Sequence, residues 1–526
     1  MGAKIAVSLA SRILAASLNI ILTPIYIKMI GIESYGIIGV YIMLLCVLQI
    51  FDLGLTQTIT RETAHLSAQR GLDRLGELLR TFEALSWTMG LTLGCLLYLA
   101  SPLLADHWVK ANALPDDVIR KALGIMAMVL AVQWPIGFYT AGLVGMQQQG
   151  QVAVAFLLGA ALRSGGAVLV LWLIEPSIEA FFIWQIIGVS IHTLIMKILL
   201  WRSARTLGCR PRFCLSAISV RWRLLISLAG IGATSRLADQ MDKVVLSQQF
   251  NLEMFGYYTL AWTIAGGLEI FVYTIHCVLF PRLCEVVSHG NGKATASTYH
   301  YGAQILCVGV LPASVVIAVF SPELLMLWTR DPGIVAATET LVRLLVIVVV
   351  FEGLLYLPDG LQTAFGWTRF MLISKGISAV VRLVMLLLLA RGNDLAAVAA
   401  GIAVLNGLLL AMTAPYVHRK LLGEWRGHWF LRDVLPVLGV SLLVALCWRG
   451  GITPPANSLS LLLYLAAVSA LCLIGGALAV PATRPWVFAI ARGKFLGELH
   501  RTPTDPVLSA TPAGVPGGVH GQAEKA

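Results

Sequence analysis

The stretch LAAVAAGIAVLNGLLLAMTAPYV, residues 395–417, runs from one polar segment to the next without a single charged side chain. A helix needs about 20 mostly apolar residues to cross the hydrocarbon core of a membrane. Residues 85–104 and 301–322 form two further charge-free stretches of this kind. Such stretches predict a helical membrane protein.

The composition of the whole chain of 526 residues supports this class. Hydrophobic residues make up 58% and charged residues 12%, and the mean hydropathy is +0.82. Soluble domains carry about 25% charged residues, and disordered chains combine low hydrophobicity with high charge. A soluble enzyme and a disordered chain are therefore both excluded. The apolar runs are also longer than the alternating segments of about 10 residues that build a membrane β-barrel.

Fourteen stretches are long and apolar enough for a membrane-spanning helix. They are residues 5–28, 36–60, 82–104, 119–146, 151–174, 178–200, 224–249, 255–281, 301–321, 337–365, 370–390, 394–416, 432–449 and 457–480. We therefore predict an all-α polytopic membrane protein with about 14 transmembrane helices.

The distribution of Lys and Arg between these spans predicts the orientation. With the N-terminus inside, 23 of the 38 Lys and Arg residues lie in inside segments and 7 in outside segments. Positive side chains concentrate in short cytoplasmic loops. We therefore expect cytoplasmic N- and C-termini. Residues 5–28 lack the small-residue cleavage site of a signal peptide and are expected to remain as the first span.

Two short segments match at an offset of 220 residues. GIESYG (31–36) follows the first predicted span, and NLEMFG (251–256) follows the seventh. Glutamate, an aromatic residue and glycine fall at equivalent positions in both. Matches at equivalent topological positions indicate an internal repeat of two six-helix lobes, as in many transporters. The alternative is that two unrelated hairpins both require Glu and Gly.

The predicted organisation has five parts. They are a six-helix lobe at 1–200, a cytoplasmic Arg-rich linker at 201–223, a second six-helix lobe at 224–416, two extra transmembrane helices at 417–480, and a cytoplasmic, largely disordered tail at 481–526. The nine cysteines are scattered, mostly inside apolar runs, so no metal or redox site is predicted.

Five polar residues inside predicted spans are candidates for binding an anionic ligand. They are Arg12, Asn19, Arg163, Arg236 and Arg382. A charge within a membrane costs about 2.5–3.5 kcal/mol on insertion scales and must face protein or a wet cavity. The planar guanidinium suits phosphate because it donates two hydrogen bonds and stays charged. The alternative is that these arginines pair with carboxylates of other helices.

Five carboxylates are candidates for coupling to H⁺ or Na⁺. They are Asp52, Asp239, Glu269, Glu352 and Asp359. Burial favours the protonated form of a carboxylate, so such a group can load and release a proton near neutral pH. Pairing between helices is the competing interpretation. In particular, Arg236, Asp239 and Lys243 share one helix face and form either a self-neutralising ladder or a binding site.

The N-terminal region resembles a known family. The residues that carry the resemblance are Asn19, Thr23-Pro24-Ile25-Tyr26, Ile30-Gly31-Ile32-Glu33-Ser34-Tyr35-Gly36, Asp52-Leu53-Gly54-Leu55 and Arg61-Glu62-Thr63-Ala64. They look like the N-terminal signature of Wzx-type polysaccharide flippases of the multidrug/oligosaccharidyl-lipid/polysaccharide (MOP) exporter superfamily. The pattern departs from that signature in the second span, which contains no arginine.

The resemblance implies a function and a setting. It implies flipping of an undecaprenyl-diphosphate-linked oligosaccharide in the bacterial inner membrane, through a cationic cavity and with cation-coupled alternating access. The diphosphate would then bind Arg12, Arg163, Arg236 or Arg382. No cofactor other than a coupling H⁺ or Na⁺ is expected. The expected partners are the lipid-linked oligosaccharide, membrane lipids, a polysaccharide polymerase and a chain-length regulator, with no nucleic acid.

Other functions stay open at this point. A lipid II flippase would share the fourteen-helix architecture. A multidrug or toxic-compound cation antiporter would need an acidic cavity, which the deep arginines disfavour. A membrane glycosyltransferase or polymerase would need a substantial outside loop, and the outer segment 105–118 is short.

Overall fold

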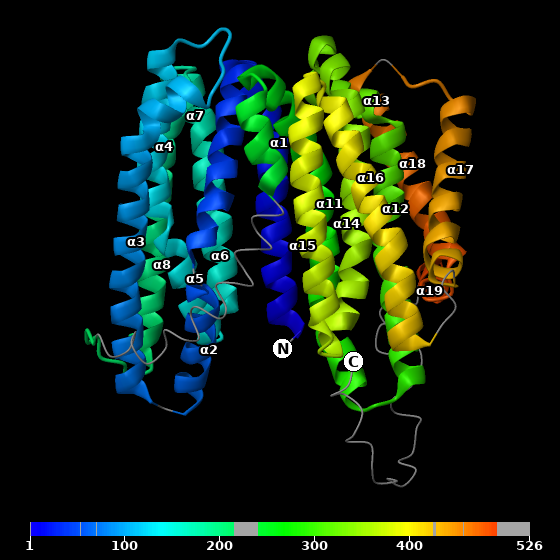
Figure 1. Cartoon of the computed structure of the whole chain (residues 1–526), viewed down its shortest axis with the longest axis horizontal. Coiled ribbons are helices and arrows are strands. Elements are labelled where there is room, and N and C mark those ends of the chain that lie inside the picture. Colours follow the sequence, from blue (N-terminus) through cyan, green and yellow to red (C-terminus); the bar gives the residue numbers. More distant parts are fainter. Residues whose placement is uncertain are drawn as a thin grey trace. The chain divides into compact units, whose positions relative to one another are not determined.

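The computed structural model describes residues 2–52, 54–69, 71–214, 240–423, 428–455 and 457–491. In this part of the chain the secondary structure is helical, apart from one isolated β-bridge between Lys110 and Asn251. Twelve of the described helical segments are long and apolar enough to cross a membrane. The predicted all-α polytopic fold is confirmed (Figure 1).

The helices of the first half of the chain follow the predicted spans closely. They are α1 (Gly2–Leu48), η1 (Gln49–Asp52), α2 (Leu55–Ala68), α3 (Leu72–His107), α4 (Asp116–Gln133), α5 (Pro135–Gly145), α6 (Gln149–Ala160), η2 (Ala161–Gly165), α7 (Gly166–Leu173) and α8 (Ile178–Thr206).

The second half adds two short helices that were not predicted, α13 and α19. Its elements are α11 (Leu252–Ser288), α12 (Gly292–Val319), α13 (Ser321–Thr329), α14 (Pro332–Ala364), α15 (Thr368–Leu389), η3 (Ala390–Gly392), α16 (Leu395–Val417), η4 (His418–Leu422), η5 (Phe430–Val434), α17 (Leu435–Gly451), α18 (Ser458–Ala479) and α19 (Arg484–Ala491). The predicted count of about 14 spans stays a prediction, because most of the seventh span lies outside the described residues.

Helix α1 contains the predicted span 5–28 and the first half of the predicted span 36–60 as two limbs, and the rest of the second span lies in η1 and α2. Gly31 interrupts α1 with φ 82° and ψ 162°, a conformation that is essentially restricted to glycine. Asn19 on one limb and Tyr41 on the other hydrogen-bond to the adjacent residues Ser164 and Arg163. In a straight helix Asn19 and Tyr41 would lie about 33 Å apart. The chain therefore turns back at Gly31.

The two segments of the predicted repeat pack directly against each other. A Cβ atom on Gly36 would overlap the carbonyl oxygen of Leu252, and one on Gly256 would lie 2.5 Å from the carbonyl oxygen of Ile32. Leu252 follows Ile32 by the same 220 residues that separate Gly256 from Gly36. The contact between α1 and α11 is therefore reciprocal, as expected for two copies of one structural element around a local two-fold axis.

The chain forms two compact units. The first comprises Met1–Ile270, Phe320–Val349 and Leu372–Gly407, and the second Phe271–Val319, Val350–Met371 and Leu408–Ala526. Buried apolar side chains of α2, α3, α5, α6 and α8 form a core in the first unit, and those of α11, α12, α14, α16, η5, α17 and α18 form a core in the second. The predicted five-part organisation stays a prediction, because the units follow local packing and divide several helices.

Many large apolar side chains lie on the surface. Trp172, Ile174 and Met412 have exposed fractions of 73%, 76% and 74%, and long helices such as α15 expose apolar residues over most of their length. Water would disfavour such a surface, whereas lipid chains solvate it. This exposure agrees with a multi-pass membrane protein.

Candidate functional site

Arg163 lies in the middle of a membrane-spanning segment, inside the π-helical turn η2. It is about 21 Å along the helix from Gln149 and about 15 Å from Leu173, at 1.5 Å per residue. π-turns are rare in helices and frequently occur at functional sites. The position and the local geometry therefore both single out Arg163 within the first unit.

Neutral side chains hold the guanidinium of Arg163. Its Nε donates to Oε1 of Gln185 at 2.9 Å, and its Nη2 donates to the hydroxyl of Tyr41 at 3.1 Å. The Tyr41 hydroxyl in turn donates to Oε1 of Gln133 at 2.5 Å. Gly188 lies beside the aliphatic stem, where an added Cβ would come within 3.0 Å of the Arg163 side chain.

The π-turn is tied to two other helices through its carbonyl groups. The indole nitrogen of Trp184 donates to the carbonyl oxygen of Leu162 at 3.0 Å, and the Tyr26 hydroxyl donates to that of Ser164 at 2.7 Å. The Ser164 hydroxyl donates to the side-chain oxygen of Asn19. Buried backbone carbonyls need such partners, so these contacts fix the turn that carries Arg163.

No carboxylate of the described residues lies within ion-pair distance of Arg163. A guanidinium has five N–H donors, and two of those of Arg163 have acceptors in the described part of the chain. The side chain is partly buried. The site therefore holds a fixed positive charge with donors left over, which is an arrangement suited to an anion.

The structure brings together two of the five predicted anion-binding residues, Arg163 and Asn19, through Ser164. Arg382 lies on α15, where its Nη2 donates to the side-chain oxygen of Asn406 at 2.7 Å. Arg236 and the side chain of Arg12 lie outside the described parts of the structure. The role of all five in binding stays a prediction.

The predicted coupling carboxylates occupy separate positions. Asp52 accepts hydrogen bonds from the hydroxyl of Thr56 at 2.8 Å and from its backbone nitrogen at 3.3 Å, at the start of α2. Glu269 is exposed, Glu352 and Asp359 are partly buried, and each of them has an interaction partner. Asp239 lies outside the described residues. In the described residues no group of three or more His, Cys, Asp or Glu could hold a metal ion.

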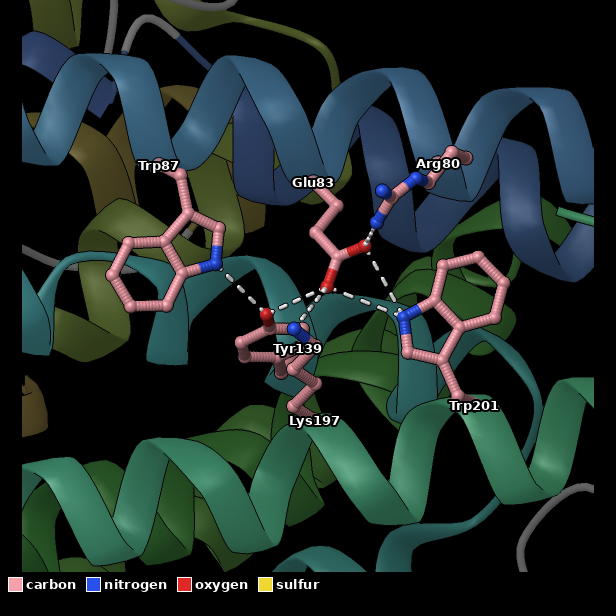
Figure 2. A network of polar contacts seen from close by, with 6 residues as sticks. All are labelled: Arg80, Glu83, Trp87, Tyr139, Lys197 and Trp201. Carbon is pink, nitrogen blue, oxygen red and sulfur yellow. Dashed lines mark hydrogen bonds and ion pairs between the residues drawn. The ribbon is translucent and has the colours of Figure 1, made fainter. Parts of the chain in front are cut away.

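Glu83 is a buried polar residue that the sequence analysis missed. Its carboxylate accepts from the Tyr139 hydroxyl at 2.8 Å, from the Trp201 indole nitrogen at 3.2 Å and from Arg80 Nη1 at 2.8 Å (Figure 2). Lys197 Nζ lies 3.9 Å away. The position falls at the first turn of the predicted span 82–104, where a charge is easily taken for an interfacial residue.

Asp433 is the second buried carboxylate that was missed. It lies in η5, is fully buried, and contacts Nδ1 of His300 on α12. Gln304, one turn further along α12, donates to its other oxygen at 2.7 Å and accepts from the backbone nitrogen of Ala482 at 2.9 Å. Both Asp433 and His300 fall at the edges of predicted spans. Their positions along the sequence therefore did not indicate that the two side chains are buried.

Comparison with solved structures identifies the fold. An inward-facing multidrug resistance MATE family transporter of the MOP superfamily matches with a TM-score of 0.66 at 13% identity, over 78% of this chain and 95% of that one. The lipid II flippase MurJ in an inward closed conformation matches with 0.65 at 13% identity, over 91% and 98%. A MOP superfamily transporter from Pyrococcus furiosus matches with 0.60 at 13% identity, over 80% and 96%.

The chain therefore has the fold of MOP superfamily transporters, a class of multi-pass membrane proteins. No curated protein sequence matches it significantly. The profile of the polysaccharide biosynthesis protein family matches residues 1–287, which is more than half of the chain. The chain belongs to this polysaccharide biosynthesis protein family, in agreement with the resemblance of its N-terminal region.

Proposed function

We propose that this protein is a flippase for an undecaprenyl-diphosphate-linked oligosaccharide. It moves the lipid-linked sugar from the inner to the outer leaflet of the bacterial inner membrane, with both termini in the cytoplasm. The product then enters the synthesis of a cell-surface polysaccharide such as O-antigen, capsule or exopolysaccharide, through a polymerase and a chain-length regulator. The protein makes and breaks no covalent bond and is not an enzyme.

The observation that carries this proposal is the guanidinium of Arg163, which has no carboxylate partner among the described residues. A diphosphate that crosses a membrane needs a positive charge near the middle of the hydrocarbon layer, because an isolated anion is strongly disfavoured there. Gln185 and Tyr41 orient Arg163 without neutralising it. Its remaining N–H donors are then available to the phosphate oxygens.

A cation gradient supplies the driving force in this proposal. Asp52, Asp239, Glu269, Glu352 and Asp359 are the candidates for exchanging H⁺ or Na⁺ as access to the site alternates. A cation that binds one of these carboxylates in the outward-facing state and leaves in the inward-facing state moves down its gradient, and its binding shifts the equilibrium between the two states. Arg12, Arg236 and Arg382 are the further candidates for contacts with the substrate.

A lipid II flippase is the second candidate function. The fold likeness to MurJ covers nearly the whole chain, and lipid II carries the same kind of diphosphate. Arg163 would serve both substrates, so the difference lies in the sugar. The membership in the polysaccharide biosynthesis protein family favours the oligosaccharide. A multidrug exporter of cations is disfavoured, since Arg163 repels them.

Replacement of Arg163 by alanine tests the proposal. We expect the initial rate of flipping to fall at least tenfold, because a hydrogen bond to a charged group contributes about 1.5–3 kcal/mol. Arg163→Lys, which keeps the charge but loses the planar fork, should retain an intermediate rate. The rate is measured in proteoliposomes, as the appearance of a fluorescent undecaprenyl-diphosphate oligosaccharide at a membrane-impermeant quencher, with and without H⁺ and Na⁺ gradients.

Arg120→Ala is the matched control for this experiment. Arg120 is half exposed and forms a surface pair with Asp106 at 2.9 Å, so its loss should leave the flipping rate unchanged. An unaltered rate in Arg163→Ala would remove Arg163 from the mechanism. Transport of a lipophilic cation or of lipid II, without transport of the oligosaccharide, would refute the proposed substrate.

A further inference from the structure

The network around Glu83 carries more positive than negative charge. Arg80 and Lys197 both approach the one carboxylate, at 2.8 Å and 3.9 Å. The Glu83 side chain is only 2% exposed, whereas those of Arg80 and Lys197 are 50% and 44% exposed. The cluster therefore presents a net positive charge outward while its counter-charge is buried.

Both cations retain hydrogen-bond donors. Within the described chain, Arg80 uses one of its five N–H groups, on Glu83. Lys197 lies at ion-pair distance from Glu83, beyond hydrogen-bond length, and donates to no other acceptor of the described residues. Glu83 thus holds both side chains nearby but leaves most of their hydrogen-bond donors free of acceptors within the described chain.

The cluster lies at the depth of lipid headgroups. Helix α3 has 36 residues and is about 54 Å long, so it extends well beyond a hydrocarbon core of about 30 Å. If the core ends near the outer end of α3, its inner boundary falls close to Glu83. Lys197 lies 19 residues into the antiparallel helix α8 and reaches the same boundary. Trp87 and Trp201 flank the cluster, as is typical of interfacial aromatic residues (Figure 2).

An exposed apolar stripe on α8 leads away from Lys197 toward the middle of the membrane. Its residues recur every three or four positions and are 39–55% exposed. They are Ile183, Ile187, Ile191, Leu194 and Ile198. This spacing places them on one face of the helix. The stripe offers an acyl chain a continuous surface that ends at the cation.

We propose that Arg80 and Lys197 bind the phosphate headgroup of an anionic phospholipid in the cytoplasmic leaflet. The guanidinium and the ammonium share the phosphate oxygens, and one acyl chain lies along the stripe of α8. Arginines at 202, 205, 210 and 212 follow on the same side, and basic clusters on this side of membrane proteins recognise anionic lipids. The site takes its side of the membrane from the proposed orientation and is otherwise independent of the proposed transport function.

Lipid titration of the purified full-length protein tests this site. Native mass spectrometry follows the binding of phosphatidylglycerol and phosphatidylcholine to the wild type and to Arg80→Gln/Lys197→Gln. We expect the double variant to lose about tenfold in affinity for phosphatidylglycerol, with no change for phosphatidylcholine. In Glu83→Gln the side-chain oxygen can still accept hydrogen bonds from Tyr139 and Trp201, but the negative charge is gone. This variant should therefore bind phosphatidylglycerol more tightly.

Arg419→Gln/Arg432→Gln is the matched control, because it removes two positive charges from exposed positions on the side of the membrane that is predicted to be cytoplasmic. The control should change the affinity for phosphatidylglycerol less than twofold. A loss as large as that of Arg80→Gln/Lys197→Gln would show nonspecific surface attraction and overturn the proposal. Displacement of phosphatidylglycerol by millimolar inorganic phosphate would indicate a site for the free ion. If a polyprenyl phosphate binds and phosphatidylglycerol does not, the proposed phospholipid site is also contradicted. Thermal unfolding of each variant shows that a loss of binding occurs in folded protein.

Discussion

Replacing Gly36 with alanine is expected to break the contact between α1 and α11 and to lower the flipping rate at least about fivefold. The new Cβ would overlap the carbonyl oxygen of Leu252 and lie 3.0 Å from its carbonyl carbon. Backbone cannot rotate away as a side chain can, so the two helices must separate. Overpacking of this kind costs about 1–3 kcal/mol, which reduces the population of the packed state about 5- to 150-fold. Flipping in proteoliposomes and thermal unfolding in detergent measure the two effects.

Gly256→Ala should have the same effect, because the contact is reciprocal. Its Cβ would lie 2.5 Å from the carbonyl oxygen of Ile32. Once one substitution has separated the helices, the other should cost much less. Independent sites add within about 0.3–0.5 kcal/mol, so the double variant distinguishes one shared contact from two separate ones.

Gly39 lies on the same helix face as Gly36 and provides a control with a milder clash. A Cβ there would overlap the hydroxyl oxygen of Thr259, which is the end of a movable side chain. Gly39→Ala should therefore cost less than Gly36→Ala, and Thr259→Ala should relieve part of that cost. Gly376→Ala, on α15 with no atom within 4 Å of the added Cβ, should have no effect. Additive losses at Gly36 and Gly256, or wild-type behaviour of both, would refute the shared contact.

Long apolar runs predicted the helices well, because a membrane leaves few alternatives to a helix for a segment of that length. The match between residues 31–36 and 251–256 predicted an internal repeat, and only the structure shows that the two segments pack against each other at Gly36 and Gly256. Arg163 was recognised from its depth alone. Its partners Gln185 and Tyr41 could not be recognised from the sequence, because they lie on other helices and no regular spacing along the chain links them to Arg163.

The position of a charged residue along a predicted span did not predict its burial when the residue lay at the end of the span. Glu83 and Asp433 both begin or adjoin a predicted span, where charges usually reach the headgroups. The structure buries them because tertiary contacts supply donors there, from Tyr139 and Trp201 in one case and from His300 in the other. Helix depth predicts the cost of a charge, whereas only the fold shows how that cost is compensated.

Replacement of Asp433 by alanine is expected to lower the free energy of unfolding by about 3–5 kcal/mol, because it breaks a buried pair and leaves its partners without an acceptor. Asp433 is fully buried, and His300 and Gln304 both direct nitrogen atoms at it. The pair joins η5 to α12, against which α17 and α18 also pack. The measurement is the temperature at which the protein in detergent loses its monodisperse elution profile.

Two further variants separate the loss of the pair from the loss of packing. Asp106→Ala removes one member of an exposed pair with Arg120 and should cost at most about 1 kcal/mol. The double variant His300→Leu/Asp433→Leu removes both buried polar groups, so it should be more stable than Asp433→Ala although it carries one more substitution. If Asp433→Ala is no less stable than Asp106→Ala, the buried pair does not hold η5 against α12. If the double variant is the less stable one, the stabilisation comes from the pair itself and exceeds the cost of removing its two polar groups from water.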